Sequence, residues 1–329
     1  MEGFRAFRID QKNDKIIAGF CDLSLDDLSP GEVVIKVSHS TINYKDALAA
    51  TGTGKILKTF PLVGGIDLAG TVVSSEDERF DPGNQVLVNG CGLSETVDGG
   101  YAEYARVKAD SVVPVPGGMS AAQAMQIGTA GYTAALAIHR MEQNNQLPED
   151  GPIVVTGATG GVGSIAVDML NATGYEVFAL TGKADKSEYL KSIGAREILL
   201  RDDVDYGKRP MEKATWGGAI DNLGGDALAW LTRTVKYGGN IASIGLASSL
   251  ALNTTVLPFI LRAVCLLGIN SVDTPRNLRL QVWERIGGDL RPRHLDIIGR
   301  RTIEFDELPD AFQAYIEGTV TGRTLVKIS

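Results

Sequence analysis

The sequence predicts an α/β protein of two domains, one rich in β-strands and one built on a doubly wound parallel sheet. Three observations predict this. Residues 1 to about 120 read as short strands separated by turns. From residue 153 onward, strand-like and helix-like segments alternate. A glycine cluster, residues 157–163, separates the first such strand from the first such helix. A chain of 329 residues has room for two domains of ~100–200 residues each.

Composition excludes several classes of partner. Hydrophobic residues make up 44% and charged residues 22% of the chain, which is ordinary for a globular protein. The net charge of −8 argues against nucleic acid or an anionic membrane as the main partner, because both require a cationic face. The charged N-terminus lacks the apolar core of a secretory signal, and Pro258 and Arg262 interrupt the most apolar stretch, residues 254–269. A cytoplasmic protein is therefore expected.

The cysteines and histidines predict neither disulfides nor a metal site. Cys21, Cys91 and Cys265 are odd in number and far apart, which argues against a disulfide framework. No two of them form a CxxC pair, so a four-thiolate zinc site cannot be built. The three histidines are scattered along the chain and are interpreted as packed or surface side chains.

The first elements indicate a β-rich, partly barrel-like domain. Residues 31–43 alternate apolar and polar side chains through Val33, Ile35 and Val37, as a half-buried strand does. Three later segments continue this pattern between Gly, Pro, Asp or Asn residues: 68–75, 84–90 and 99–107. The C-terminal segment, residues 322–329, is also strand-like and is expected to pair back onto this domain.

After Pro116 the sequence becomes helical and then alternating. Residues 120–141 are rich in alanine at helical spacing, with Ser120 as the predicted N-cap. The predicted strands that follow a turn at 148–152 are 153–156, 176–180, 197–200, 218–222, 240–244 and 265–271. The helices predicted between them are 162–173, 185–193 and 226–236. Such alternation is typical of a parallel sheet covered by helices on both faces.

The glycine turn has the setting of a dinucleotide site. A turn that opens a helix presents free N–H groups and a positive dipole to a phosphate, and glycines let the backbone approach a pyrophosphate closely. This turn follows a strand, opens a helix and leads into a second strand, so an ordinary tight turn is the less favoured interpretation. Ala158 replaces the usual first glycine, leaving Gly157-x-x-Gly160-x-x-Gly163. The helix is expected to bury one face, made of Val162, Ile165, Ala166, Met169 and Leu170.

The end of the second strand indicates which dinucleotide binds. An NAD site normally carries Asp or Glu there, to bind the ribose 2′-hydroxyl. This chain has Thr181-Gly182-Lys183 instead. A carboxylate repels a 2′-phosphate, whereas a hydroxyl and an ammonium bind one. Arg201, after the third strand, adds a second cation. These residues favour NADPH.

Eight segments in a fixed order resemble one family. They are INYKDALAATGTGKI, GGIDLAGTVV, IGTAGYTAAL, VTGATGGVGS, YLKSIGA, GAIDNLGG, TTVLPFILR and GRTLVKI. Together they resemble the zinc-independent branch of the medium-chain dehydrogenase/reductase superfamily. The resemblance is closest to the acrylyl-CoA reductase group of its quinone-oxidoreductase-like proteins, and it covers essentially the whole chain.

The resemblance implies a fold, a cofactor and a reaction. It implies a GroES-like catalytic domain over residues 1–125 and 267–329, with a Rossmann NADPH-binding domain over 126–266. Zinc enzymes of this superfamily carry a cysteine ligand where this chain has NYKD, and a His-Glu pair where it has GGID, so no zinc is expected. The implied reaction is NADPH-dependent reduction of the conjugated C=C of a short enoyl thioester, acrylyl-CoA to propanoyl-CoA. A homodimer is expected, with the apolar segment near residues 257–267 as an edge-strand interface.

Site residues follow from the matched motifs. Tyr44 and Asn43 are the predicted catalytic residues. The main role expected of Tyr44 is that of a positioning residue, and its secondary role is that of an acid. The predicted cofactor-binding residues are Tyr44, Thr129, Thr159, Gly160, Gly161, Val162, Thr181, Gly182, Lys183, Arg201, Leu246, Ile260 and Ser271. A structural ion pair between Lys45 and Asp46 is a further expectation, and Lys55, Lys58 and Arg323 are the candidates for binding the phosphates of coenzyme A.

Three alternatives compete with this assignment, and the first and the third stay open. An NADPH:quinone or enone oxidoreductase on the same fold differs only in the finer motifs. Thr156 to Gly163 also fits the T-G-x-x-x-G-x-G turn of short-chain dehydrogenases, but the only Tyr-x-x-x-Lys, Tyr104 to Lys108, lies upstream in strand-like sequence. The third alternative is an NADPH-binding protein without enzymatic activity, as in lens crystallins of this superfamily.

Overall fold

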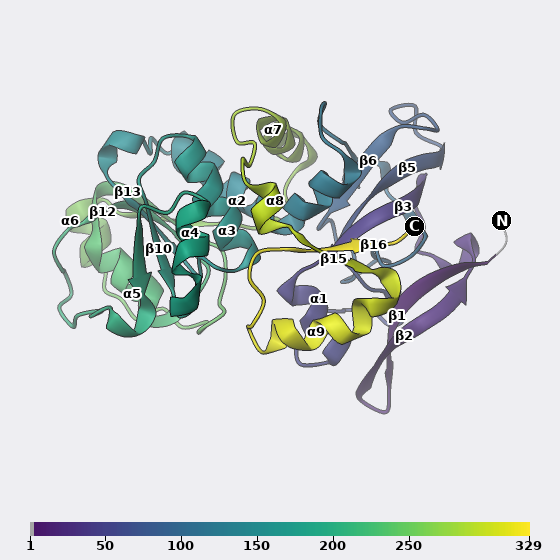
Figure 1. The fold of residues 1–329 in the computed structure, drawn as a ribbon, viewed down its shortest axis with the longest axis horizontal. Coiled ribbons are helices and arrows are strands. Elements are labelled where there is room, and N and C mark those ends of the chain that lie inside the picture. The colour runs from purple at the N-terminus through teal and green to yellow at the C-terminus, as the bar shows by residue number, and fades with distance from the viewer. Residues whose placement is uncertain (1–2) are drawn as a thin grey trace. The chain divides into compact units, whose positions relative to one another are not determined.

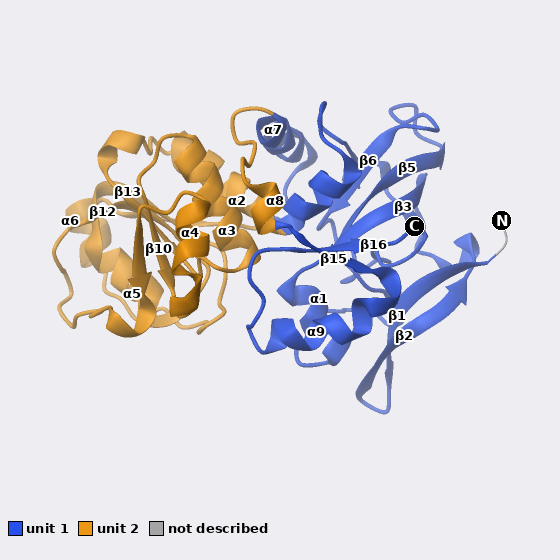
Figure 2. Ribbon diagram, in the orientation of Figure 1, with its two compact units in different colours: residues 1–129, 271–287, 299–329 blue, residues 130–270, 288–298 orange. Residues whose placement is uncertain are grey.

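The computed structural model describes residues 3–329 and divides into two compact units. Unit 1 contains the chain up to Thr129, residues 271–287 and residues 299–329, and unit 2 contains residues 130–270 and 288–298 (Figure 2). The boundaries expected after residues 125 and 266 lie close to the observed boundaries after residues 129 and 270. It differs at residues 288–298, which return to unit 2 and were expected in the catalytic domain.

Unit 1 is built on a seven-stranded sheet and a three-stranded sheet (Figure 1). The larger sheet has the order β15-β16-β3-β5-β6-β8, with β7 pairing with β3. Its strands are β15 (Arg301–Glu304), β16 (Thr324–Lys327), β3 (Val33–Ile42), β5 (Asp67–Ser75), β6 (Gln85–Asn89), β8 (Val113–Pro114) and β7 (Tyr104–Val107). The smaller sheet contains β2 (Lys15–Leu23), β1 (Phe4–Lys12) and β4 (Leu62–Val63). The helices that belong wholly to unit 1 are α1 (Tyr44–Thr51), α7 (Arg276–Gly287) and α9 (Leu308–Ile316).

Strand β3 organises unit 1. It pairs with β5 on one side, and on the other side with β7 along its first half and β16 along its second half. The expected return of the C-terminal segment is confirmed, because Thr324 pairs with Ile42 and Lys327 pairs with His39. The end of β3, where α1 begins, therefore lies beside the last strand of the chain.

Unit 2 is a six-stranded parallel sheet in the order β11-β10-β9-β12-β13-β14. Its strands are β9 (Ile153–Thr156), β10 (Val177–Thr181), β11 (Glu197–Leu200), β12 (Trp216–Asp221), β13 (Val235–Ser243) and β14 (Cys265–Gly268). Its helices include α3 (Gly161–Ala172), α4 (Ser187–Ser192), α5 (Gly225–Thr234), α6 (Leu257–Arg262) and α8 (Leu295–Ile298). The chain runs outward from β9 in one direction and from β12 in the other, so right-handed crossovers place helices on both faces. The predicted doubly wound sheet is confirmed.

Helix α2 (Ala121–Gln143) contains a break that its sequence pattern did not predict. Its start is as predicted, because the Ser120 hydroxyl accepts from the Gln123 N–H and the Gln123 side chain accepts from the Ser120 N–H. Gly128, however, has φ 51° and ψ −157°, which no helical residue adopts. The helix therefore restarts at Thr129, the last residue of unit 1.

Helix α3 is more deeply buried than predicted. Residues 163–170 are all buried, whereas Val162 is partly exposed, so the expected single buried face is wrong. The reason is residues 288–298, which cover its other side. His294 donates its backbone N–H to the Asp168 carboxylate at 3.0 Å, and its Nδ1 lies 2.8 Å from the same carboxylate.

Candidate active site and cofactor site

In unit 1, the predicted catalytic residues lie at the start of α1. Asn43 caps the helix, and its backbone N–H donates to the Asp46 carboxylate at 2.8 Å. Tyr44 is the first helical residue, and half of its surface is exposed. Lys45 binds Glu95 at 2.6 Å, so the expected ion pair with Asp46 is wrong. The helix start thus presents the Tyr44 side chain while Asn43 and Asp46 are held inside.

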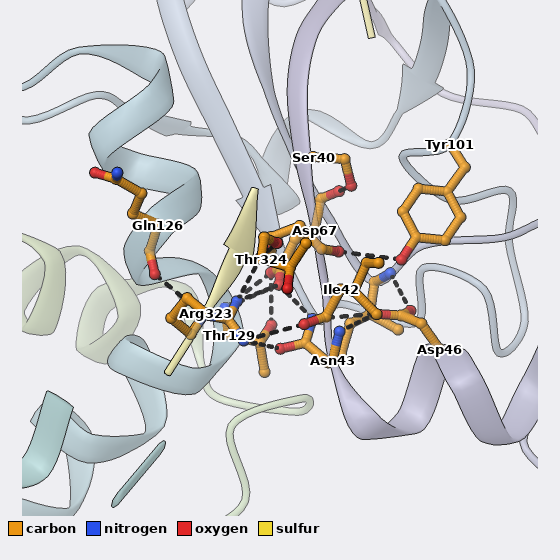
Figure 3. Close-up of polar contacts among 12 residues, drawn as sticks. Ser40, Ile42, Asn43, Asp46, Asp67, Tyr101, Gln126, Thr129, Arg323 and Thr324 are labelled. Carbon is orange, nitrogen blue, oxygen red and sulfur yellow. Dashed lines mark hydrogen bonds and ion pairs between the residues drawn. The ribbon is translucent and has the colours of Figure 1, made fainter. Parts of the chain in front are cut away.

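A buried polar network lies directly behind this helix start (Figure 3). Asp67, the first residue of β5, is completely buried. Its carboxylate accepts from the Asn43 side-chain amide at 2.7 Å, from the Thr129 hydroxyl at 2.7 Å and from the Thr129 backbone N–H at 2.9 Å. Two predicted site residues from distant parts of the sequence therefore meet at one carboxylate.

Arg323 supplies the positive charge of this network. Its guanidinium is 2% exposed and lies 4.0 Å from the Asp67 carboxylate. It donates to the Asn43 amide oxygen at 3.0 Å and to the Thr41 hydroxyl at 2.8 Å, as well as to the backbone carbonyls of Ile42 and Gln126. The expectation that Arg323 binds a coenzyme A phosphate is wrong, because burial and these bonds occupy the guanidinium.

Asn43 is fully engaged by the same network. Its amide oxygen accepts from Arg323, and its amide nitrogen donates to both Asp67 and Asp46. The side chain is nearly buried, with 9% exposed. Among the predicted site residues near α1, Tyr44 is the one whose side chain extends to the surface.

Asp46 is a buried carboxyl group with an unusual pKa. Burial and the nearby Asp67 charge together raise the pKa of Asp46 to about 7, against the opposing effect of hydrogen bonds from Asn43 and from the Ile66 N–H. A buried carboxylate is costly without a countercharge. Protonation of Asp46 therefore relieves the repulsion between its charge and that of Asp67.

In unit 2, the glycine turn has the geometry that the sequence predicts. Gly157 has φ 58°, a left-handed conformation that favours glycine. A Cβ on Gly163 would lie 2.4 Å from the Gly157 carbonyl oxygen, so only glycine lets α3 begin this close to β9. Gly160 is the N-cap of α3 and has no side chain to bind the first amides of the helix. Residues 159–162 thus form a helix start suited to a pyrophosphate.

A second buried aspartate fixes this turn from the neighbouring strand. Asp221, at the end of β12, accepts from the Thr156 hydroxyl at 2.7 Å and from the Gly224 N–H at 2.8 Å. Asn222 donates from its side chain to the Thr156 carbonyl at 2.7 Å. The order in which the strands are added to the sheet reverses between β9 and β12. Doubly wound sheets bind ligands at the carboxyl ends of the strands at such a point.

The predicted 2′-phosphate residues also come together. The Thr181 hydroxyl accepts from the Lys183 N–H at 3.1 Å and lies 3.4 Å from the Thr159 hydroxyl. A Cβ on Gly182 would lie 3.2 Å from the guanidinium carbon of Arg201, which places that guanidinium directly against the loop. Burial and the nearby Lys186 charge lower the pKa of Lys183. Arg201 also binds Asp202 at 3.1 Å, so part of its charge is shared.

The remaining predicted residues divide between the units. Leu246 and Ile260 lie in unit 2 with 64% and 67% of their surfaces exposed, and Leu246 lines a pocket of about 230 Å³ beside Gly224 and Ser243. Ser271 lies in unit 1, where its carbonyl accepts from Arg279 at 3.2 Å. Unit 1 thus holds Asn43, Tyr44, Thr129 and Ser271, and unit 2 holds the other predicted site residues.

Sequence reasoning missed Asp67 and Asp221 as members of the sites, and it named Arg323 for a coenzyme A phosphate and not for the buried network. The signal for the aspartates was present, because each lies in an otherwise apolar strand segment, GGIDLAG and GAIDNLGG. A carboxylate in such a setting is buried and must find partners. Arg323 gave no comparable signal, because its partners Thr41 and Asn43 lie about 280 positions away in the sequence.

Residues 3–329 contain neither a membrane-spanning helix nor a metal-binding cluster. No helix there has the length and apolarity needed to cross a membrane. No group of three or more His, Cys, Asp or Glu side chains within the same range is arranged to hold a metal ion.

Comparison with known proteins gives consistent results over the whole chain. The family model described as "Alcohol dehydrogenase GroES-like domain" matches residues 29–117, and the one described as "Zinc-binding dehydrogenase" matches residues 161–286. The chain is 44% identical to the acrylyl-CoA reductase AcuI of Ruegeria pomeroyi, over 97% of each chain. It is 45% identical over 99% of each chain to YhfP of Bacillus subtilis, whose name describes a quinone oxidoreductase.

Two solved structures extend these similarities to the fold. The yhdH oxidoreductase of Salmonella enterica, in complex with NADP, is 46% identical with a TM-score of 0.95, covering 99% of this chain and 100% of that one. The Bacillus subtilis yhfP structure, with NAD bound, is 45% identical with a TM-score of 0.96 and the same coverage. The chain therefore belongs to the medium-chain dehydrogenase/reductase superfamily, in the acrylyl-CoA reductase group of its quinone-oxidoreductase-like members.

Proposed function

We propose that the protein is an NADPH-dependent oxidoreductase that reduces the conjugated C=C of a short enoyl thioester, converting acrylyl-CoA to propanoyl-CoA. The cationic loop in unit 2 is the observation that carries the cofactor assignment. Thr181, Lys183 and Arg201 gather there, and the loop has no acid where an NAD site places one. Full-length similarity to acrylyl-CoA reductase AcuI supports the substrate class.

The residues present fit NADPH. Residues 159–162 offer backbone amides to the pyrophosphate, and the Thr181–Lys183 loop with Arg201 offers a hydroxyl and two cations to the 2′-phosphate. We place Leu246, Ile260 and Ser271 at the nicotinamide end on family resemblance. NADPH, when bound, supplies the hydride that adds to the β-carbon of the enoyl thioester.

The protein must then stabilise charge and deliver a proton. As the hydride adds, negative charge moves to the thioester oxygen, which requires hydrogen-bond donors such as hydroxyl and backbone N–H groups. A proton then joins the α-carbon and completes the reduction. We propose that the half-exposed Tyr44 hydroxyl orients the acyl group, and that Asn43 positions Tyr44, because its own amide is occupied within the protein. Tyr44→Phe distinguishes proton delivery by Tyr44 from delivery by solvent, through the pH profile of kcat.

The first test is NADPH oxidation with acrylyl-CoA, run beside NADH at the same concentration. The expected result is turnover with NADPH and little with NADH. NADPH binding without turnover on acrylyl-CoA would overturn the thioester assignment. Quinones and free enones are then the next substrates, in line with the name of YhfP. Binding without turnover on any acceptor would support a non-enzymatic NADPH-binding protein.

A homodimer is proposed on a separate observation. Within the described residues, strand β14 is the last in its sheet and pairs only with β13. Leu266 in this strand is 37% exposed, and Ile260 and Leu261 on the preceding helix α6 are 67% and 61% exposed. An uncovered strand edge with apolar neighbours suits a second copy of the chain. Sedimentation that gives a monomer mass at working concentration would exclude this.

Two finer proposals complete the assignment. Lys55 and Lys58 remain the candidates for the phosphates of coenzyme A, since both are exposed. Charge reversal of Lys58 should raise KM for acrylyl-CoA and leave KM for NADPH unchanged.

We also place the protein in the cytoplasm, because Cys21, Cys91 and Cys265 are all free thiols. The reducing cytosol keeps cysteines in this state.

A further inference from the structure

We propose that Asp67 is a positioning residue that holds Tyr44 and Thr129 in one fixed geometry, by binding the start of α1 and the restart of α2 with a single carboxylate. The proposal rests on the proposed function for its kinetic consequence, although the geometry itself does not depend on it. Asp67 touches neither substrate nor cofactor in this account. It acts through the two segments that it binds.

The first link is to α1. Asp67 accepts from the Asn43 amide at 2.7 Å, and Asn43 is the N-cap residue immediately before Tyr44. The same amide nitrogen lies 3.2 Å from Asp46, the residue that completes the capping box. The direction in which α1 leaves β3 therefore depends on where Asp67 holds Asn43.

The second link is to the break in α2. Gly128 interrupts the helix, so Thr129 begins a new helical segment whose first N–H groups have no helical acceptors. The Asp67 carboxylate accepts from both the N–H and the hydroxyl of Thr129. It thus caps this segment from another strand, and its negative charge faces the positive end of the helix dipole.

Close packing makes the arrangement rigid. A Cβ on Gly128 would lie 2.8 Å from the Asp67 carboxylate and 2.8 Å from the Arg323 guanidinium. Asp67 is fully buried and Arg323 nearly so, so neither side chain has solvent into which it can move. The carboxylate, the guanidinium and the helix break therefore hold one another in place (Figure 3).

Asp98 provides a matched control in the same unit. It is also buried, and its carboxylate accepts from the Ser29 N–H, the Ser29 hydroxyl and the Val63 N–H at 2.7 Å each. Like Asp67 it accepts from a hydroxyl and from backbone N–H groups, but none of its donors belongs to a predicted site residue. Loss of the Asp98 charge therefore reports what removal of a buried carboxylate does to stability alone.

The experiment compares Asp67→Asn with Asp98→Asn in the full chain. Steady-state kinetics with NADPH and acrylyl-CoA are measured alongside hydrogen–deuterium exchange. For Asp67→Asn, kcat should fall about 100-fold, as expected for a misplacement near 1 Å, with KM for NADPH changed less than about 3-fold. Exchange should rise at residues 43–47 and 127–131 together. Asp98→Asn should keep kcat within about 2-fold and raise exchange only near residues 29 and 63.

Gly128→Ala gives a second test that leaves every acidic and site residue in place. Its Cβ should displace Asp67 and raise exchange at residues 43–47, which lie about 80 positions away in the sequence. A kcat of Asp67→Asn within about 3-fold of wild type, an equal loss in Asp98→Asn, or unchanged exchange at residues 43–47 in both Asp67→Asn and Gly128→Ala would overturn the proposal. Absence of wild-type turnover overturns the proposed function instead, and exchange still decides the positioning.

Discussion

Unit 2 forms its glycine turn from consecutive residues, which Asp221 then anchors through Thr156, whereas unit 1 assembles its buried network mainly from residues far apart. The turn occupies residues 157–163 between one strand and one helix. In unit 1, Asp67 binds partners 24 and 62 positions away, and Arg323 reaches Asn43 across 280 positions. The turn is a local conformation that glycines permit, and the network is a product of the folded sheet. Its residues should therefore affect stability and function together.

The largest effect is expected from removal of the buried cation. Arg323→Met leaves the buried Asp67 carboxylate without its guanidinium partner, which should lower the free energy of unfolding by about 3–5 kcal/mol. Urea unfolding measures this loss. Lys327→Met, at the end of the strand that follows Arg323 but with its side chain 51% exposed beside Glu304, should cost less than about 0.5 kcal/mol. Equal losses in the two variants would contradict the role of the network.

The next effect concerns the turn. Gly163→Ala places a Cβ against the Gly157 carbonyl, which should cost about 1–3 kcal/mol of stability and separate α3 from β9. NADPH affinity should fall as well, because the first amides of the helix move. Thermal unfolding and NADPH fluorescence titration measure the two losses. Gly117→Ala, where an added Cβ has open space, serves as the control.

A third effect is a dependence of stability on pH. The pKa of Asp46 is about 7 in the folded protein and 3.8 ordinarily, so the folded state binds more protons between about pH 4 and pH 7. The free energy of unfolding should therefore fall as pH rises through that window, and the Asp46 contribution should become constant above it. Between pH 5 and pH 8 this amounts to about 3 kcal/mol. Asp46→Asn, measured by urea unfolding over the same range, should show a correspondingly shallower slope.

The smallest effect tests the cofactor loop. Lys183→Ala should raise KM for NADPH about 10-fold, as expected for loss of one charge-assisted hydrogen bond, and leave KM for NADH unchanged. Lys191→Ala on α4, where the lysine binds Glu188 at the surface, should change neither value. If Lys183→Ala raised KM for NADPH and KM for NADH equally, the lysine would act on the dinucleotide as a whole and not on its 2′-phosphate.

The features that could be predicted from the sequence are those that local contacts determine, and the features that could not be predicted depend on distant contacts. Strands 153–156 and 197–200 were predicted with the observed bounds, because runs of apolar residues between turns are local signals. The break at Gly128 was missed, because the surrounding alanine-rich pattern is helical throughout. The break depends on Asp67 and Arg323, whose side chains occupy the space that a Cβ at position 128 would need.

The sequence by itself determined the two kinds of domain, the glycine turn and the Thr181–Lys183 loop. Each of these depends on short runs of residues that have their own conformational preferences. Only the tertiary structure decided that Lys45 binds Glu95, that Arg323 is buried and that Asp67 joins Asn43 to Thr129. The physical reason is that a buried charge takes whichever partners the fold brings within hydrogen-bond distance. In unit 1 those partners come from β3, β5, α2 and the last strand of the chain.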